Sequence, residues 1–369
     1  MREGWEYKKL NEVCDKGSSN IVINKLIDNN GDYPLYGASG LIKDIDFYHQ
    51  DKRYIGIVKD GAGVGRVNIY PAFSSLVGTM QYIFPKEGYS LDFIKYFLIK
   101  LDLSHCVSGA TIPHIYFKDY GKELIPTPSL DAQLEIVSEL DKINELIRLK
   151  KEQLKDFDNL AQSLFYEMFG DPVENEKGWE VKKLGELLKV IGGYAFKSDK
   201  YKDEGIPILR IGNINSGFFR DTNLVFAESD EKLEKYKIFP GDIVISLTGT
   251  VGKSDYGNVC IMDDAYNFYY LNQRNAKLEI FGNLDKYYLS AILKNEDIKS
   301  RLTSISRGVR QANIANKDIE NLQIPLPPLP LQQLFSQRID QIEHQKAEVQ
   351  KAITDLETLL ASRMQYWFE

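Results

Sequence analysis

The chain has 369 residues, 43% of them hydrophobic and 27% charged, with a formal net charge of −7. This length suits two or three domains, and the composition is that of a globular protein, which excludes global disorder. No run of 18 apolar residues occurs that could span a membrane, and the N-terminus has no apolar leader, so we expect a cytoplasmic protein.

The charge is unevenly distributed. Residues 1–130 are neutral, residues 131–170 carry −4, residues 171–330 carry −1 and residues 331–369 carry −2. A local basic face is therefore compatible with the acidic total. The 3 cysteines are far apart without a CxxC pair, and the 4 histidines have no metal spacing, so we expect no metal site.

The chain opens with Gly4-Trp5-Glu6-Tyr7-Lys8-Lys9-Leu10, and the pattern G-W-E-x-K-K-L returns 174 residues later at 178–184. Ile125-Pro126-Thr127-Pro128-Ser129-Leu130 has its counterpart 199 residues later at 324–329. Gly109 and Gly308, and Gln133 and Gln332, share that second offset. The chain is therefore two versions of one unit, and the second version carries the extra residues.

In the first version we expect a domain of mixed α and β structure over residues 1–130. Residues 53–58 are typical of a strand. The next motif, Gly61-Ala62-Gly63-Val64-Gly65-Arg66, predicts a tight turn that can approach a phosphate backbone. Residues 103–118 contain no acidic side chain. The candidate nucleic-acid contacts of this half are Arg66, Thr111, His114 and Lys118.

Residues 131–170 show the heptad rhythm of a coiled-coil helix, with core positions spaced alternately by four and three residues. Its predicted core residues are Ile136, Leu140, Ile143, Ile147, Leu154, Phe157 and Leu164. The outer core positions, Ile136 and Met168, are separated by about 50 Å at 1.5 Å per residue. Gly170 and Pro172 are suited to ending this helix.

The second version is predicted over residues 171–330. Residues 242–247 are typical of a strand, and Gly249-Thr250-Val251-Gly252-Lys253-Ser254 predicts a second glycine-rich turn. A nucleotide-binding P-loop is disfavoured because Leu247 stands where that motif needs glycine. Residues 299–317 contain no acidic side chain, and Arg, Gln and Asn there are suited to base edges. The candidate contacts of this half are Lys253, Lys299, Arg301, Arg307, Arg310, Gln311, Asn313 and Lys317.

Residues 331–369 repeat the heptad rhythm in register with the first helix. The predicted core residues are Ile339, Ile342, Val349, Ile353, Leu356 and Leu360. The first helix ends where the second domain begins, so a second helix that pairs with it must run back, and we expect an antiparallel coiled coil. The alternative is two separate amphipathic helices, each packed on its own domain.

The usual catalytic motifs are missing. The sequence has no methyltransferase-like Asn-Pro-Pro-Tyr stretch, no G-x-S-x-G elbow and no HExxH helix. We therefore expect no catalytic residues and a role other than that of an enzyme.

The duplicated architecture resembles a known family. Two different halves each open with G-W-E-x-K-K-L and close with I-P-x-P-x-L-x-x-Q before a heptad helix, and the first helix ends in Phe165-Tyr166-Glu167-Met168-Phe169-Gly170-Asp171-Pro172. This pattern is similar to the specificity subunit of type I restriction-modification systems, over essentially the whole chain.

The resemblance implies that residues 1–130 and 171–330 are target recognition domains, each reading one part of an asymmetric bipartite site in double-stranded DNA. Residues 131–170 and 331–369 would set the spacer. It also implies two methyltransferase (modification) subunits and restriction/translocase subunits as partners. S-adenosylmethionine, ATP and Mg would be bound by those partners, and no cofactor by this chain.

Other interpretations remain open. The chain could be a helical adaptor or scaffold protein that does not bind DNA. It could also be the specificity subunit of a methylation-only or fused restriction system.

Overall fold

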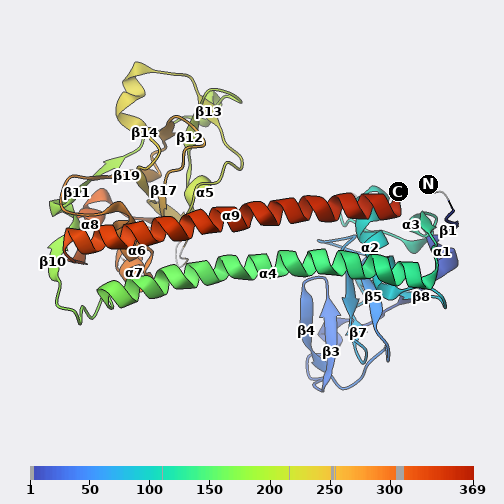
Figure 1. Ribbon diagram of the computed structural model, residues 1–369. Coiled ribbons are helices and arrows are strands. Elements are labelled where there is room, and N and C mark those ends of the chain that lie inside the picture. The colour runs from blue at the N-terminus through green and yellow to red at the C-terminus, as the bar shows by residue number, and fades with distance from the viewer. Residues whose placement is uncertain (1–3, 110, 216, 251–252, 254, 305–310) are drawn as a thin grey trace. The chain divides into compact units, whose positions relative to one another are not determined.

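The computed structural model describes residues 4–109, 111–215, 217–250, 253, 255–304 and 311–369. It divides into two compact units, unit 1 (Met1–Gln153 and Val349–Glu369) and unit 2 (Leu154–Glu348). Two 40-residue helices, α4 (Leu130–Phe169) and α9 (Leu329–Phe368), each contribute one stretch to unit 1 and one to unit 2 (Figure 1). None of the helices in the described ranges has the length and apolarity that a membrane crossing requires.

Unit 1 is built on an antiparallel four-stranded sheet in the order β2-β8-β5-β6. A second sheet has the order β4-β3-β7, with β3 and β7 parallel. The strands are β1 (Tyr7–Lys9), β2 (Cys14–Ser18), β3 (Tyr33–Gly37), β4 (Gly40–Ile45), β5 (Tyr54–Val58), β6 (Val67–Tyr70), β7 (Ser75–Leu76), β8 (Met80–Pro85) and β9 (Leu124–Pro126). The shorter helices are α1 (Leu10–Val13), α2 (Leu91–Leu101) and α3 (Phe117–Tyr120).

Helix α2 covers the four-stranded sheet of unit 1. Ser90 caps its first turn by accepting a hydrogen bond from the backbone N–H of Phe93. Phe93 and Phe97, one turn apart, are buried in the same cluster as Ile55 and Ile83 of the sheet. The helix therefore forms where a capping serine precedes an apolar stripe of helical period.

Unit 2 repeats this plan with additions. Its first sheet has the order β11-β19-β15-β17 and its second the order β13-β12-β18-β14. The strands are β10 (Glu180–Lys183), β11 (Leu188–Gly192), β12 (Ile206–Leu209), β13 (Phe226–Ala227), β14 (Lys237–Ile238), β15 (Ile243–Ser246), β16 (Thr248–Thr250), β17 (Val259–Ile261), β18 (Tyr269–Leu271), β19 (Asn275–Ile280), β20 (Gln311–Asn313) and β21 (Gln323–Leu326). The shorter helices are α5 (Ile211–Ile214), α6 (Lys286–Lys294), α7 (Glu296–Thr303) and α8 (Asn316–Glu320).

The sequence repeat is visible in the strand register. Tyr7 lies opposite Pro126 in the β1-β9 pair, and Val181 lies opposite Pro325 in the β10-β21 pair. These positions are related by the two sequence offsets, 174 for the first member and 199 for the second. The repeated motifs therefore pair the beginning of each version with its proline-rich end.

The repeated tryptophans lie at the ends of the long helices. In unit 1, Trp5 stacks on Trp367 of α9, with ring centroids 6.0 Å apart and planes at 8°. In unit 2, the indole N–H of Trp179 donates a hydrogen bond to the carbonyl of Phe169, the last residue of α4, at 2.8 Å. Each G-W-E motif therefore anchors the end of a long helix in its own unit.

The long helices are antiparallel in both units. In unit 1 the early residue Glu139 of α4 pairs with the late residue Arg363 of α9. In unit 2 the late residues of α4 meet early ones of α9, since Lys346 lies 2.9 Å from Asp158 and the rings of Phe169 and Phe335 are 5.2 Å apart. The expected architecture, mixed α and β with two sheet-bearing domains and an antiparallel helix pair, is confirmed.

The predicted core positions of the two helices are all buried or half-buried. Eight are buried, namely Ile136, Leu140, Ile143, Ile147, Leu164, Ile342, Val349 and Ile353. Five are half-buried, namely Leu154, Phe157, Ile339, Leu356 and Leu360. Their burial accounts for the heptad rhythm of both helices.

Candidate functional site

In unit 1 the glycine-rich turn meets the acid-free segment. The backbone N–H of Gly61 donates to the carbonyl of Pro113 at 2.9 Å, and that of Ile115 donates to the carbonyl of Lys59 at 2.9 Å. Asp60 and His114 form an antiparallel bridge between these bonds. Gly61 has a φ of 85°, a left-handed value that favours glycine at this turn.

Unit 2 joins the corresponding segments in the same way. Strand β16 pairs antiparallel with β20, so Thr248 lies opposite Asn313. The backbone N–H of Ile314 donates to the carbonyl of Leu247 at 2.9 Å. The prediction that Gly249 and Thr250 belong to a turn was wrong, because they form a strand with β20.

These contacts define equivalent places in the two units, which we call the paired segments: residues 59–61 with 113–115, and residues 247–250 with 311–314. His114 and Asn313 are related by the offset of 199 and occupy equivalent bridging positions. The sequence analysis singled out the glycine-rich motif and the acid-free segment of each half separately. It contained no signal that the two segments lie side by side.

The candidate contacts of unit 1 surround its paired segments. Arg66, Thr111 and Lys118 are exposed and His114 is half-buried. The ring of His114 packs edge-on against Tyr116, with centroids 4.9 Å apart, and the Lys118 ammonium lies 5.1 Å from the centroid of Tyr116. Tyr116 is 48% exposed. An exposed aromatic ring beside a cation suits a nucleic-acid surface, and sequence reasoning missed this tyrosine although it lies within the acid-free segment.

The candidate contacts of unit 2 differ in accessibility. Lys253, Arg301, Asn313 and Lys317 are exposed. Lys299 is half-buried in α7 and donates from Nζ to the Asn258 side chain at 2.5 Å. Burial lowers the pKa of Lys299. Arg307 and Arg310 lie outside the described residues, as does the side chain of Gln311.

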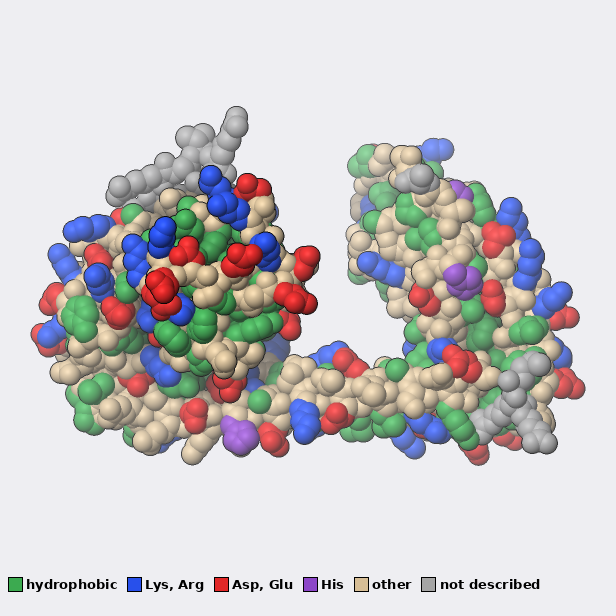
Figure 2. All heavy atoms as spheres, turned by 90° about the horizontal axis from the view of Figure 1, so that it is seen from above, with side chains coloured by type: hydrophobic (Ala, Val, Ile, Leu, Met, Phe, Trp, Pro, Cys, Tyr) green, Lys and Arg blue, Asp and Glu red, His purple; other side chains and the backbone are tan. Residues whose placement is uncertain are grey.

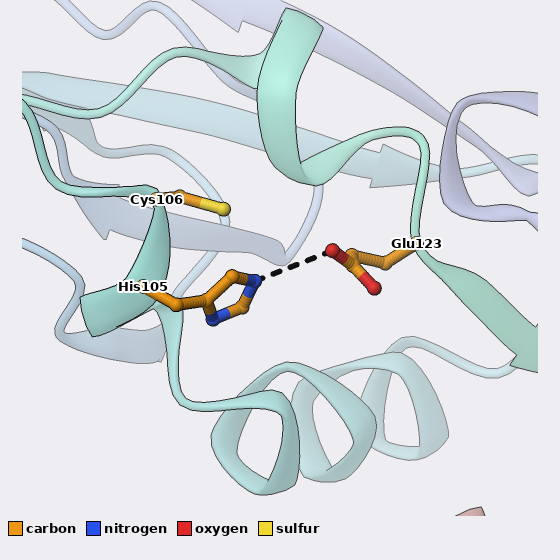
Figure 3. Close-up of side chains that lie close together, drawn as sticks. All are labelled: His105, Cys106 and Glu123. Carbon is orange, nitrogen blue, oxygen red and sulfur yellow. Dashed lines mark hydrogen bonds and ion pairs between the residues drawn. The ribbon is translucent and has the colours of Figure 1, made fainter.

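Three side chains of metal-ligand type lie together in unit 1: His105, Cys106 and Glu123, whose ligand atoms are all within 4.8 Å of one another (Figure 3). His105 Nε2 lies 3.2 Å from a Glu123 oxygen and His105 Nδ1 lies 2.8 Å from the Asp102 carbonyl. Both ring nitrogens thus face acceptors, and these two hydrogen bonds raise the pKa of His105. The imidazolium form can donate to both partners, so the His105–Glu123 contact can also form as an ion pair.

The charge pattern agrees with the near-neutral charge of both sequence halves. On the face drawn in Figure 2, Lys and Arg side chains are interspersed with Asp and Glu side chains. Cations and anions that alternate in this way do not form a broad basic patch on that face.

Comparison with known proteins identifies the family. The sequence matches the Type I restriction modification DNA specificity domain over residues 2–156 and 176–358. The MjaVIII type I restriction enzyme specificity subunit of Methanocaldococcus jannaschii is 26% identical over 329 residues, covering 82% of this chain and 76% of the relative. The MjaIX specificity subunit of the same organism is 26% identical over 300 residues, covering 75% and 68%.

A solved structure has the same fold. The type I restriction-modification S subunit from M. genitalium aligns with a TM-score of 0.59 and 16% identity, covering 100% of this chain and 98% of that one. The two matched ranges of the family domain correspond to the two versions of the repeat. This chain belongs to the family of type I restriction-modification DNA specificity proteins.

Proposed function

We propose that each unit of this chain reads one part of an asymmetric bipartite DNA target through its paired segments. The observation that carries this proposal is the equivalence of the two paired segments combined with their different side chains. His114 in unit 1 stands where Asn313 stands in unit 2, and Asp60 stands where Thr248 stands. Side chains of different hydrogen-bonding character favour different bases, so the two half-sites differ.

The candidate contact residues are of two kinds, those suited to reading bases and those suited to contacting phosphates. Asn313 can form two hydrogen bonds with adenine, and Arg307 and Arg310 can form two with guanine. Exposed cations such as Lys118 and Lys317 can contact phosphates, which position the protein without reading sequence. A partner that shares the phosphate contacts would supply affinity that the near-neutral units lack.

The helices α4 and α9 would set the distance between the half-sites. Each has 40 residues and measures about 60 Å at 1.5 Å per residue. That length exceeds one turn of duplex DNA, about 34–36 Å. Two recognition units on such helices can therefore engage separate turns of one duplex.

Catalysis would come from partner subunits. The resemblance suggests modification subunits that bind S-adenosylmethionine and restriction/translocase subunits that use ATP and Mg. Helix α4 has leucines that its own unit leaves partly exposed, with Leu134 at 51%, Leu146 at 48% and Leu149 at 46%. Apolar side chains of this kind are suited to docking another protein. The duplication favours two modification subunits per chain.

The decisive experiment is methylation profiling of DNA from cells that express the chain with its candidate modification subunit. We expect one bipartite motif with two different halves. Replacing Asn313 by Ala should relax one position of one half, and replacing His114 by Ala should relax one position of the other. A matched change at exposed Lys189, on β11, should leave the motif unchanged.

The outcome also separates the alternatives. A chain that binds the modification subunit but supports no sequence-specific methylation and shifts no DNA in a gel would be an adaptor. Methylation of a single symmetric motif would contradict the assignment of one half-site to each unit. Native mass spectrometry of the complex tests the expected two modification subunits per chain.

A further inference from the structure

Unit 2 has a polar pocket beside its paired segments. Its volume is about 490 Å³, and Thr248, Gly249 and Thr250 of β16 form one wall. Asp255 and Arg274 also line it. Because β16 pairs with β20, the pocket is continuous with the strand that carries Asn313.

Asp255 is fixed in this pocket by the strand next to it. One carboxylate oxygen accepts from the backbone N–H of Thr250 at 2.8 Å, and the other accepts from the Thr250 hydroxyl at 2.8 Å. These bonds lower the pKa of Asp255, so the carboxylate is ionised at neutral pH. Each oxygen keeps a free lone pair, since an ionised carboxylate can accept about four hydrogen bonds.

Arg274 is fixed only through its backbone. Its carbonyl accepts from the N–H of Leu247 at 2.8 Å, and its own N–H donates to the Asn272 side chain at 3.2 Å. The side chain is exposed. Within the described part of the chain, no hydrogen bond or ion pair engages the Arg274 guanidinium, although Asp255 lines the same pocket.

Arg274 and Asp255 line one pocket without forming an ion pair with each other, so the pocket offers both donors and acceptors. A phosphate would be attracted by Arg274 and repelled by Asp255. The edge of a base pair offers both acceptors for Arg274 and a donor for Asp255. Guanine presents the O6 and N7 acceptors that Arg binds with two hydrogen bonds, and the paired cytosine presents the N4 donor that a carboxylate accepts.

We propose that this pocket reads a G·C base pair in the half-site of unit 2, with Arg274 bound to guanine and Asp255 to cytosine. This inference rests on the proposed function and assigns a specificity role to two residues outside the paired segments. Thr250 is the positioning residue, since it holds the carboxylate of Asp255. Sequence reasoning missed Arg274 because a single arginine after β18 carries no motif.

The test uses the full chain in complex with its modification subunit. Arg274→Ala and Arg274→Lys are profiled for methylation motif and measured for DNA binding across salt concentrations. We expect both variants to lose discrimination at one G·C position of one half-site by about 5- to 150-fold, the loss of one two-bond contact. The other half-site should be unchanged. Lysine keeps the charge but presents its donors from one atom rather than from a planar fork, so it should not restore full discrimination.

Asp255→Asn should relax the same base pair. Because Asp255 also accepts hydrogen bonds from Thr250, the thermal unfolding of the Asp255→Asn variant is measured as well. The arginine variants do not affect these bonds, so their results do not depend on them. Lys189→Ala is the matched control for loss of one cation in unit 2.

Two results would overturn the inference. One is a wild-type motif in both arginine variants. The other concerns the salt dependence of DNA binding. If the slope of log affinity against log salt falls by about one unit in Arg274→Ala and returns to its wild-type value in Arg274→Lys, Arg274 contacts a phosphate. Failure of the proposed function would look different, since the wild-type complex itself would then show no bipartite motif.

Discussion

Gln133 near the start of α4 occupies the same environment in unit 1 as Gln332 near the start of α9 does in unit 2. The side-chain oxygen of Gln133 accepts from the backbone N–H of Ser90 at 2.8 Å, and that of Gln332 accepts from the N–H of Asp285 at 2.8 Å. Both glutamines are almost fully buried. Ser90 and Asp285 cap α2 and α6, so each glutamine ties a long helix to a helix of the sheet domain.

The remaining bonds of these glutamines are also equivalent. The amide of Gln133 donates to the Pro128 carbonyl at 2.9 Å, and that of Gln332 donates to the Pro327 carbonyl at 2.7 Å. The repeated glutamine that follows the proline-rich motif therefore has a structural role. It fixes the direction in which the long helix leaves its domain.

We expect Gln332→Leu to destabilise unit 2 by about 1–3 kcal/mol, because leucine fills the space but leaves the partly buried Asp285 N–H and the buried Pro327 carbonyl unsatisfied. Urea denaturation followed by circular dichroism measures this change. Gln341→Leu, at an exposed position of α9, is the control and should change stability by less than about 0.5 kcal/mol. Equal midpoints of urea denaturation for the two variants would show that Gln332 does not contribute to stability.

The pairing of α4 with α9 in unit 1 should depend on pH through Glu139. Hydrogen bonds from Arg363 and from the indole N–H of Trp367 lower the pKa of Glu139. A lowered folded-state pKa stabilises the fold above the unfolded value of about 4.3, and this contribution is lost as pH falls through the folded value.

A double-mutant cycle with Glu139→Gln and Arg363→Gln measures this interaction. The coupling free energy at pH 7 should be about 0.2–1 kcal/mol, since both side chains remain partly exposed to solvent. It should vanish in acid. A coupling that stays constant between neutral and acidic pH would show that the charge of Glu139 does not contribute to the contact.

Periodic and repeated features could be predicted from the sequence. The heptad spacing of Ile136 and Leu140 reflects burial on one helix face, and burial at a fixed period leaves a direct trace in sequence. The two repeat offsets likewise anticipated which strands correspond. These features depend on local or regularly spaced residues.

Contacts without a period could not be predicted. Lys59 and Ile115 are joined by a single backbone hydrogen bond, which any side chain permits, so the sequence holds no mark of it. Lys299 looked like a surface cation, yet it donates to Asn258, 41 positions away along the chain. The burial of one charged side chain follows from tertiary packing, which single residues do not reveal.

His105 should titrate above the usual value of about 6.5. Its hydrogen bonds to the Asp102 carbonyl and the Glu123 carboxylate raise its pKa. A raised folded-state pKa means that the stabilising contribution is present below the unfolded value and is lost as pH rises through the folded one. An NMR titration of histidine-labelled protein measures the shift.

Glu123→Gln should lower the His105 pKa, because an amide does not stabilise the imidazolium as a carboxylate does. The bond to Asp102 remains, so part of the shift should persist. A His105 resonance that titrates at the same pH in both proteins would show that the Glu123 contact is not formed in solution.

Shortening both long helices by one heptad should shorten the spacer of the DNA target. Lys151 of α4 lies 2.7 Å from Glu357 of α9 in unit 1, so residues 147–153 and 351–357 face each other across the helix pair. Deleting both heptads removes about 10 Å from each helix and returns the flanking core residues to the same face. About 10 Å corresponds to about three base pairs at 3.4 Å each.

We therefore expect the shortened chain to methylate the same two half-sites with about three fewer base pairs between them. Deletion of residues 147–153 alone is the control, since it changes α4 without α9 and should lower the thermal stability of the helix pair. Methylation profiling of DNA from cells that express each variant with the modification subunit measures the spacer length. If the double deletion still methylates the original site with its original spacer, the helices do not set the distance between half-sites.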